Sequence, residues 1–104
     1  MSVRMSNGAG AGVAGAVTQA LALRAGLPPL SAARAGSDVA AAVRDGGEAI
    51  SITYAGTDNR LVVVFSASDA ELDRLSDGLA DHAPGRSARA LELRFERPSL
   101  RPVP

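Results

Sequence analysis

Two short segments joined by a turn place the strongest limit on how this chain can fold. In "AISITYA" (49–55) apolar and polar residues alternate, whereas "RLVVVFS" (60–66) is almost continuously apolar. Between them, "GTDN" (56–59) holds residue types that favour turns. Alternation gives a strand one buried face, and a continuous apolar run is typical of a strand buried on both faces. We therefore expect a β-hairpin whose second strand is central in its sheet.

A third strand is expected near the C-terminus, in "RALELRFE" (89–96). Its alternation places Leu91, Leu93 and Phe95 on the inner face and charged residues on the outer face. Pro98 would end the strand, because proline has no N–H group to donate to a neighbouring strand.

The N-terminal half predicts two helices. In the first, residues 13–25, an inner face is expected from Val13, Val17 and Leu21, and Gly26 is placed to end the helix. The second covers about residues 32–45, with Ser31 as its N-cap. Its expected inner residues are Ala35, Val39, Ala42 and Val43.

A third helix is predicted in "SDAELDRLSDGLADH" (68–82). Ser68 and Glu71 have the spacing of a capping box, in which each residue satisfies an N–H group at the helix start. The expected inner residues are Leu72, Leu75 and Leu79, and the outer face is acidic.

The expected order is α-α-β-β-α-β, a two-layer α+β fold of the broad α/β class with helices packed on one face of the sheet. A right-handed crossover through the third helix would make the last strand parallel to the second, in a small mixed three-stranded sheet. We expect residues 1–12 to form a flexible glycine-rich leader, residues 13–97 a single compact domain, and residues 98–104 a proline-rich tail.

Composition excludes several functional classes. The formal net charge of zero argues against a nucleic-acid or membrane-surface partner, and the absence of cysteine excludes disulfides and thiolate metal sites. Apolar stretches fall short of the roughly 20 residues that a membrane span needs, so a cytoplasmic location is expected. Only 3% of the 104 residues are aromatic, which predicts a thin aliphatic core.

Gly10, Gly12 and Gly15 have the G-x-G-x-x-G spacing of a turn that holds a pyrophosphate. The segment "GAGVAGAVTQALALRAG" (10–26) resembles the first turn and helix of flavin-dependent monooxygenases, which implies a nucleotide or flavin site at these glycines. The pattern departs from that family at Gln19, where a small residue is expected, and at Ala33, where an acidic residue is expected.

A longer segment, residues 21–66, resembles the anti-sigma regulatory members of the histidine-kinase-type ATPase superfamily. The shared order is a helix, "GL" with a loop, a helix carrying an E-x-x-x-N box, a glycine-rich break and a hairpin. The box positions here hold Asp38 and Ala42, so the amide that holds Mg²⁺ in the family is absent. "SASDA" (66–70) also lacks the glycines of the family's D-x-G-x-G motif. The resemblance therefore implies a pseudo-ATPase that keeps the scaffold without the chemistry.

The remaining candidate site is acidic. Asp69, Asp73, Asp77 and Asp81 recur every four residues along one side of the third helix. They could form a docking surface for a basic partner, a weak cation site, or a solvated face paired with the arginines of the C-terminal quarter. His82, the only histidine, ends this helix, where the dipole favours its protonated form.

These observations favour a small non-catalytic regulatory domain that binds and sequesters a protein partner or self-associates, without a cofactor. The alternatives are a nucleotide- or flavin-binding protein that uses Gly10, Gly12 and Gly15, and a structural homo-oligomer.

Overall fold

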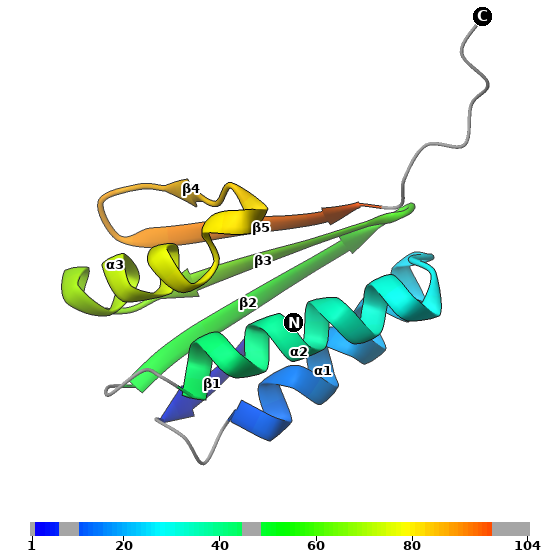
Figure 1. Cartoon of the computed structure of the whole chain (residues 1–104), viewed down its shortest axis with the longest axis horizontal. Helices are drawn as coiled ribbons and strands as arrows, with labels where there is room; N and C mark the ends of the chain where they lie inside the picture. The colour runs from blue at the N-terminus through cyan, green and yellow to red at the C-terminus, as the bar shows by residue number, and fades with distance from the viewer. Residues whose placement is uncertain (1, 7–10, 45–48, 97–104) are drawn as a thin grey trace, which may run out of the picture.

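The computed structural model describes residues 2–6, 11–44 and 49–96 (Figure 1). In chain order the elements are β1 (Ser2–Ser6), α1 (Ala11–Ala25), α2 (Pro29–Arg44), β2 (Ala49–Thr57), β3 (Arg60–Ser66), α3 (Asp69–Gly78), the 3₁₀ turn η2 (Ala80–His82), β4 (Gly85–Arg86) and β5 (Ala90–Glu96).

The strands form one sheet of order β1-β2-β3-β5-β4, in which every neighbouring pair is antiparallel. The predicted hairpin is confirmed: Thr57 pairs with Arg60, so the turn between β2 and β3 is the two residues Asp58 and Asn59. Asn59 takes the left-handed conformation that such tight turns require, with φ of 61°. The predicted central position of β3 is also confirmed.

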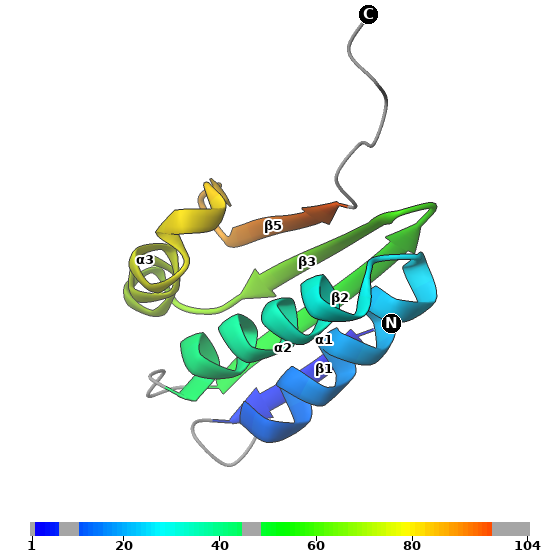
Figure 2. The ribbon, with the colours of Figure 1, turned by 45° about the vertical axis from the view of Figure 1, so that its right-hand side comes forward.

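All the helices cover one face of the sheet, as predicted, and the fold is α+β. Figure 2 shows α1 and α2 side by side across the sheet, with α3 near the end where β3 stops. The sheet residues of the core are Ile50, Ile52, Tyr54, Leu61, Val63, Phe65, Leu91, Leu93 and Phe95. On the opposite face, Val62 and Val64 are only half-buried, so the prediction that β3 is buried on both faces is wrong. No helix covers this second face in the described part of the chain.

The sheet has five strands instead of the three predicted, and the first additional strand is β1. Ser2 to Ser6 pair with β2, from Ser2 opposite Thr53 to Ser6 opposite Ala49, so part of the expected leader belongs to the sheet. The segment "SVRMS" does alternate, but with two apolar residues it is too short to stand out as a pattern. Pairing with the free edge of β2 supplies its hydrogen bonds.

The second additional strand, β4, explains why the sheet is antiparallel and not mixed. β3 and β4 are both antiparallel to β5, so they run in the same direction. The chain that leaves β3 through α3 therefore reaches its parallel partner at β4 and then returns antiparallel as β5. The crossover was predicted, but a strand of two residues gives no periodicity, so it was assigned to the wrong strand.

The most buried side of α1 lies one position along the helix from the predicted side, although the predicted Val17 and Leu21 are partly buried and pack against the core. Ala14, Thr18 and Ala22 are fully buried, whereas Val13 is 54% exposed. The cause is a close approach of α1 to α2: a Cβ added to Gly15 would lie 2.9 Å from the carbonyl oxygen of Gly36. Helices this close leave no room for large side chains, so the smallest residues of α1 face inward.

The end of α1 is as predicted. Gly26 has φ of +103°, its N–H donates to the carbonyl of Leu23, and the N–H of Leu27 donates to that of Ala22. This is a Schellman motif, which glycine favours. The turn between β2 and β3 lies against it, because the N–H of Asn59 donates to the carbonyl of Ala25 at 2.6 Å.

The other two helices differ from the predictions at their ends. α2 begins at Pro29, before the predicted N-cap Ser31, because proline is well suited to a first helical position. Its predicted inner residues are all buried. α3 stops at Gly78, and Leu79 leaves helical geometry with φ of −113° before η2. The cap of Ser68 is confirmed, since its side chain accepts from the N–H of Glu71, and Leu72, Leu75 and Leu79 are buried as predicted.

Candidate functional site

The three glycines of the G-x-G-x-x-G pattern do not form one turn. Gly10 lies outside the described residues, while Gly12 and Gly15 lie inside α1 and not in a turn before it. A Cβ at Gly12 would meet nothing within 4 Å, whereas one at Gly15 would meet both Gly36 and Ala40. Gly15 is therefore needed for helix packing.

The four aspartates of the acidic face are all exposed, and part of the face is paired internally. One guanidinium nitrogen of Arg86 lies 3.5 Å from a carboxylate oxygen of Asp69 and 3.4 Å from one of Asp73. Of the C-terminal arginines, Arg94 instead pairs with Glu92 on its own strand, at 3.4 Å. Asp77 and Asp81 form none of the ion pairs found among the described residues.

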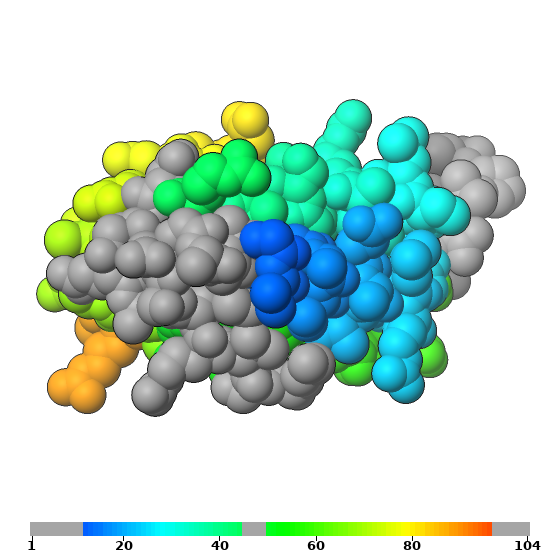
Figure 3. Space-filling model, turned by 90° about the horizontal axis from the view of Figure 1, so that it is seen from below, coloured from blue at the N-terminus to red at the C-terminus, as the bar shows by residue number. Residues whose placement is uncertain are grey.

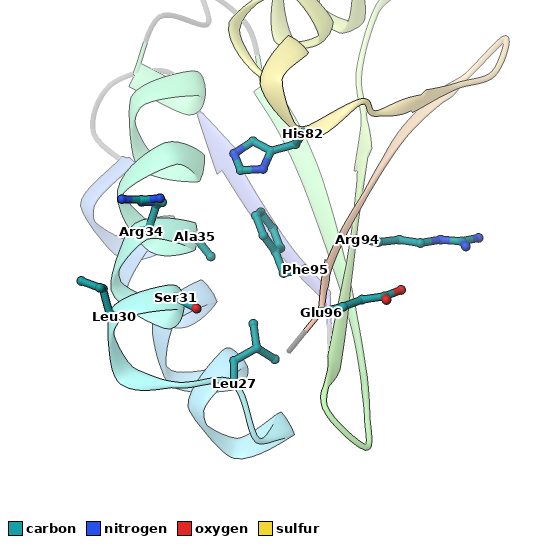
Figure 4. A pocket seen from close by; sticks show the side chains of 9 residues that line it. All are labelled: Leu27, Leu30, Ser31, Arg34, Ala35, His82, Arg94, Phe95 and Glu96. Atoms are coloured by element: carbon teal, nitrogen blue, oxygen red, sulfur yellow. The ribbon is translucent and has the colours of Figure 1, made fainter. Parts of the chain in front are cut away.

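A hollow lies between the start of α2, the end of β5 and η2 (Figure 4). We call it the α2–β5 pocket; its volume is about 290 Å³. The side chains of Leu27, Ser31, Ala35, His82 and Phe95 turn toward it, with Leu30 and Arg34 on its α2 rim. Arg94 and Glu96 contribute backbone, because their side chains point to the other face of the sheet (Figure 4).

A single polar bridge crosses above the pocket. Nε2 of His82 lies 2.8 Å from a carboxylate oxygen of Asp38, so η2 is tied to the middle of α2. The imidazole also stands edge-on to the ring of Phe95, with the ring centroids 5.2 Å apart. The expectation that His82 ends the third helix is wrong, because α3 stops at Gly78 and His82 lies in η2, with a partner 44 residues away in sequence.

The charges around the pocket are unevenly balanced. Asp38 is held by His82, and Glu96 is held by Arg60 at 3.0 Å. Arg34 lines both this pocket and a second hollow that continues past the bridge to Asp81. No acid among the described residues forms an ion pair with Arg34. The guanidinium of Arg34 therefore has no direct ion pair among the described residues, although Asp38 and Asp81 line the second hollow with it.

A second polar contact, between α1 and β2, was not predicted. The hydroxyl of Thr18 lies 2.7 Å from the carbonyl oxygen of Ala14, to which it can donate, and it shares a hydrogen bond of 2.9 Å with the hydroxyl of Tyr54, in which either group can be the donor. Burial raises the pKa of Tyr54 above its ordinary value of 10.0, and the bond to Thr18 opposes this increase only in part. Both side chains are at least 96% buried, so this contact supports the fold and does not meet ligands.

The exposed side of α1 carries no charge as far as Leu23. Figure 3 shows α1 and α2 next to each other on this surface. From Ala11 to Leu23, α1 contains no charged residue, although Val13 and Leu23 are 54% and 44% exposed. Leu30, on the rim of the α2–β5 pocket, is 76% exposed. Apolar side chains exposed in one region are a feature of surfaces that bind other proteins.

Two serines of the described residues lie near these elements but are not placed beside His82. Ser68 is engaged as the cap of α3, and Ser31 lies at the opposite end of the α2–β5 pocket from His82 (Figure 4). Within residues 2–6, 11–44 and 49–96, no cluster of three acidic, histidine or cysteine side chains could hold a metal ion. None of the helices in these same ranges is long and apolar enough to cross a membrane.

The Asp38–His82 bridge is the main feature that sequence reasoning missed. No sequence motif links Asp38 to His82. The two residues meet only because the crossover through α3 brings η2 over α2. Comparison with known proteins gives no relative: no protein-family model, no curated protein and no solved structure matches this chain.

Proposed function

We propose that this chain is a non-catalytic regulatory domain that works by binding and sequestering a protein partner in the cytoplasm. The nearest specific form is an anti-sigma-type regulator without ATPase activity. The observation that carries the proposal is the state of the two positions that correspond to the E-x-x-x-N box. Asp38 is bound by His82, and Ala42 is 93% buried against the sheet.

In the family that residues 21–66 resemble, the acid of this box activates a water and the amide holds Mg²⁺. Here the carboxylate of Asp38 already accepts a hydrogen bond from His82 at 2.8 Å, and a methyl group stands at the amide position. The oxygen that would face a water is thus already bound to His82, and no amide is present at the second position of the box. This supports a scaffold that keeps the helix–helix–hairpin order of the family and lacks its hydrolytic chemistry.

The surfaces support protein binding. α1 presents a face that is uncharged as far as Leu23, with Val13 and Leu23 exposed and Arg24 at its end, and Leu30 projects beside the α2–β5 pocket. Interface cores are depleted of charge and rich in apolar side chains, and these residues have that character. The acidic face of α3 adds a separate charged surface, of which Asp77 and Asp81 remain available for a basic partner.

Two titrations test the proposal. The first measures binding of ATP, ADP, FAD and NAD to the full chain by calorimetry, with Mg²⁺ present; no saturable heat is expected. The second measures binding of purified sigma factors from the source organism; at least one is expected to form a stable complex. The double variant Asp73→Arg and Asp77→Arg should weaken that complex, and Asp58→Arg, on the β2–β3 turn, is the matched control.

The outcomes separate the alternatives. Saturable binding of ATP would contradict the loss of nucleotide chemistry, and binding of FAD or NAD would favour the glycine-based alternative. Failure of every sigma factor to bind, together with a concentration-dependent mass in light scattering, would favour a structural homo-oligomer. The proposal requires that a sigma factor binds while the nucleotides do not.

A further inference from the structure

We infer that the α2–β5 pocket accepts one large apolar side chain of the partner protein, and that Arg34 binds a carboxylate next to that side chain in the partner's sequence. This inference rests on the proposed function and adds to it the chemistry of the partner segment. It follows from the size of the pocket, the polarity of its walls and the charge on its rim.

The size of the pocket fits a single side chain. A volume of about 290 Å³ is roughly ten times the ~30 Å³ share of one water molecule in the liquid. It can hold an aromatic ring or a leucine, but not a helix, which is about 10 Å across. Leu27, Ala35 and Phe95 form an apolar floor that is already almost wholly buried. An inserted side chain would therefore leave water without requiring the core to rearrange.

The polar atoms of the wall are fixed in position. Because Nε2 of His82 is held by Asp38, the imidazole cannot turn freely, and its Nδ1 faces the pocket above Phe95 (Figure 4). The hydroxyl of Ser31 faces the pocket from α2 (Figure 4). These two groups can meet the backbone of an incoming segment, while the floor receives its side chain. Pre-positioned groups reduce the entropy lost on binding.

The rim selects for a negative charge. Glu96 on the pocket wall is engaged by Arg60, and Asp38 in the adjoining hollow is engaged by His82, whereas Arg34 has no ion pair among the described residues and only Asp81 shares that hollow without one. An acidic residue beside the apolar anchor would pair with this guanidinium. Leu30, 76% exposed on the same rim, would cover the contact and exclude water from it.

The experiment uses three blocked dipeptides as probes of the full chain: N-acetyl-Phe-Glu-amide, N-acetyl-Phe-Gln-amide and N-acetyl-Ala-Glu-amide. Binding is followed by ¹H–¹⁵N NMR up to about 20 mM, since a single anchor gives a millimolar dissociation constant. We expect N-acetyl-Phe-Glu-amide to shift the amides of Ala35 and Phe95 saturably. The Gln probe should bind about threefold more weakly, as the loss of one exposed ion pair implies, and the Ala probe should not saturate.

Matched variants locate the site. Ser31→Phe fills the pocket and should abolish binding, whereas Ser37→Phe, at an exposed position of α2, should not. Arg34→Gln should make the Glu and Gln probes bind equally, whereas Arg44→Gln, on the same helix, should keep their difference. If Ser31→Phe does not fold, the site is still tested by titrating N-acetyl-Phe-Glu-amide into the parent, and by comparing the Glu and Gln probes on Arg34→Gln and Arg44→Gln.

The inference is overturned if the Phe probes leave Ala35 and Phe95 unshifted, if Ser31→Phe binds them as the parent does, or if Arg34→Gln keeps the preference for Glu. These failures are distinct from failure of the proposed function. If a sigma factor binds the parent and Ser31→Phe equally well, the proposed sequestration stands and only the role of the α2–β5 pocket in it is contradicted.

Discussion

The two parts of the helical layer are attached to the rest of the molecule in different ways. α1 and α2 meet through glycine and alanine, with a Cβ at Gly36 placed only 2.6 Å from the carbonyl oxygen of Gly15. The arm formed by α3, η2 and β4 packs through leucines and is also held to α2 by the contact of His82 with Asp38, while Arg86 of β4 pairs with Asp69 and Asp73 within the arm. The first attachment depends on shape, so it should tolerate salt but not added volume. The attachment of the arm should tolerate single substitutions, and it should weaken as salt is added, because salt screens interactions between charged groups.

The largest expected effect comes from adding volume to the helix pair. Gly36→Val places a branched side chain against the backbone of α1, and we expect the free energy of unfolding to fall by about 3 kcal/mol. Urea denaturation measures this loss. Gly12→Ala, where a Cβ meets open space, is the control and should leave stability equal or slightly higher. If Gly36→Val is as stable as the parent, α1 and α2 can move apart without loss of stability, and the prediction that their close packing requires glycine at position 36 is wrong.

The next effect concerns the end of α1. Gly26→Ala forces an alanine into φ of +103° and directs its Cβ at the side chain of Asn59, 2.7 Å away. We expect a loss of about 1–2 kcal/mol, because this conformation is costly for residues that carry a Cβ. Thermal unfolding provides the measurement. Gly78→Ala, with open space around it, should be nearly neutral, and a similar loss there would argue against a conformational cause.

Tyr54→Phe tests the polar contact beneath α1. Loss of the hydrogen bond to Thr18 should reduce stability by about 1 kcal/mol at neutral pH. The pH dependence has a definite sign: burial raises the pKa of Tyr54 in the folded state, so the unfolded chain loses its proton first as the pH rises above 10.0. The parent should therefore lose stability above that pH, and Tyr54→Phe should lose less. Parallel alkaline curves for the two proteins would refute this assignment.

The smallest effect is expected in the arm. His82→Ala removes the bridge to Asp38, whose partners are partly exposed, so global stability should change by less than about 1 kcal/mol. The difference from the parent should shrink in 1 M salt, where screening is strong, at a Debye length of about 3 Å. Hydrogen exchange should quicken around η2 and not in α1. Faster exchange throughout the chain would mean that the arm and the helix pair unfold as one unit.

The same contrast accounts for what the sequence could predict. Elements with local signals were found: the capping residue Ser68, the leucines of α3, the turn before Arg60 and the helix end at Gly26. The inner side of α1 was predicted only in part: Val17 and Leu21 pack against the core, but the close contact of Gly15 with Gly36 accompanies full burial of the small residues Ala14 and Ala22 and exposure of Val13. The hydrophobic periodicity of a sequence shows which residues are apolar, but it does not show how closely the backbones of α1 and α2 approach each other.

Long-range pairing was beyond the sequence. β4 has two residues and β1 only two apolar positions, so each exists because a neighbouring strand has a free edge. The Asp38–His82 bridge joins residues 44 positions apart through a crossover whose destination was unknown. For the same reason the α2–β5 pocket could not be anticipated: its walls come from a loop, a helix, a turn and a strand that meet only in the folded chain.

The hydrogen bond from the amide of Asn59 to Ala25 has a consequence for observing this molecule in motion. Asn59 lies in an exposed two-residue turn, where amides ordinarily exchange with solvent within seconds, yet its donor is tied to the last residue of α1 at 2.6 Å. Its deuterium uptake should therefore follow the lifting of α1 from the hairpin instead of fluctuations of the turn. The exchange rate of the Asn59 amide thus reports how often the helical layer opens away from the hairpin.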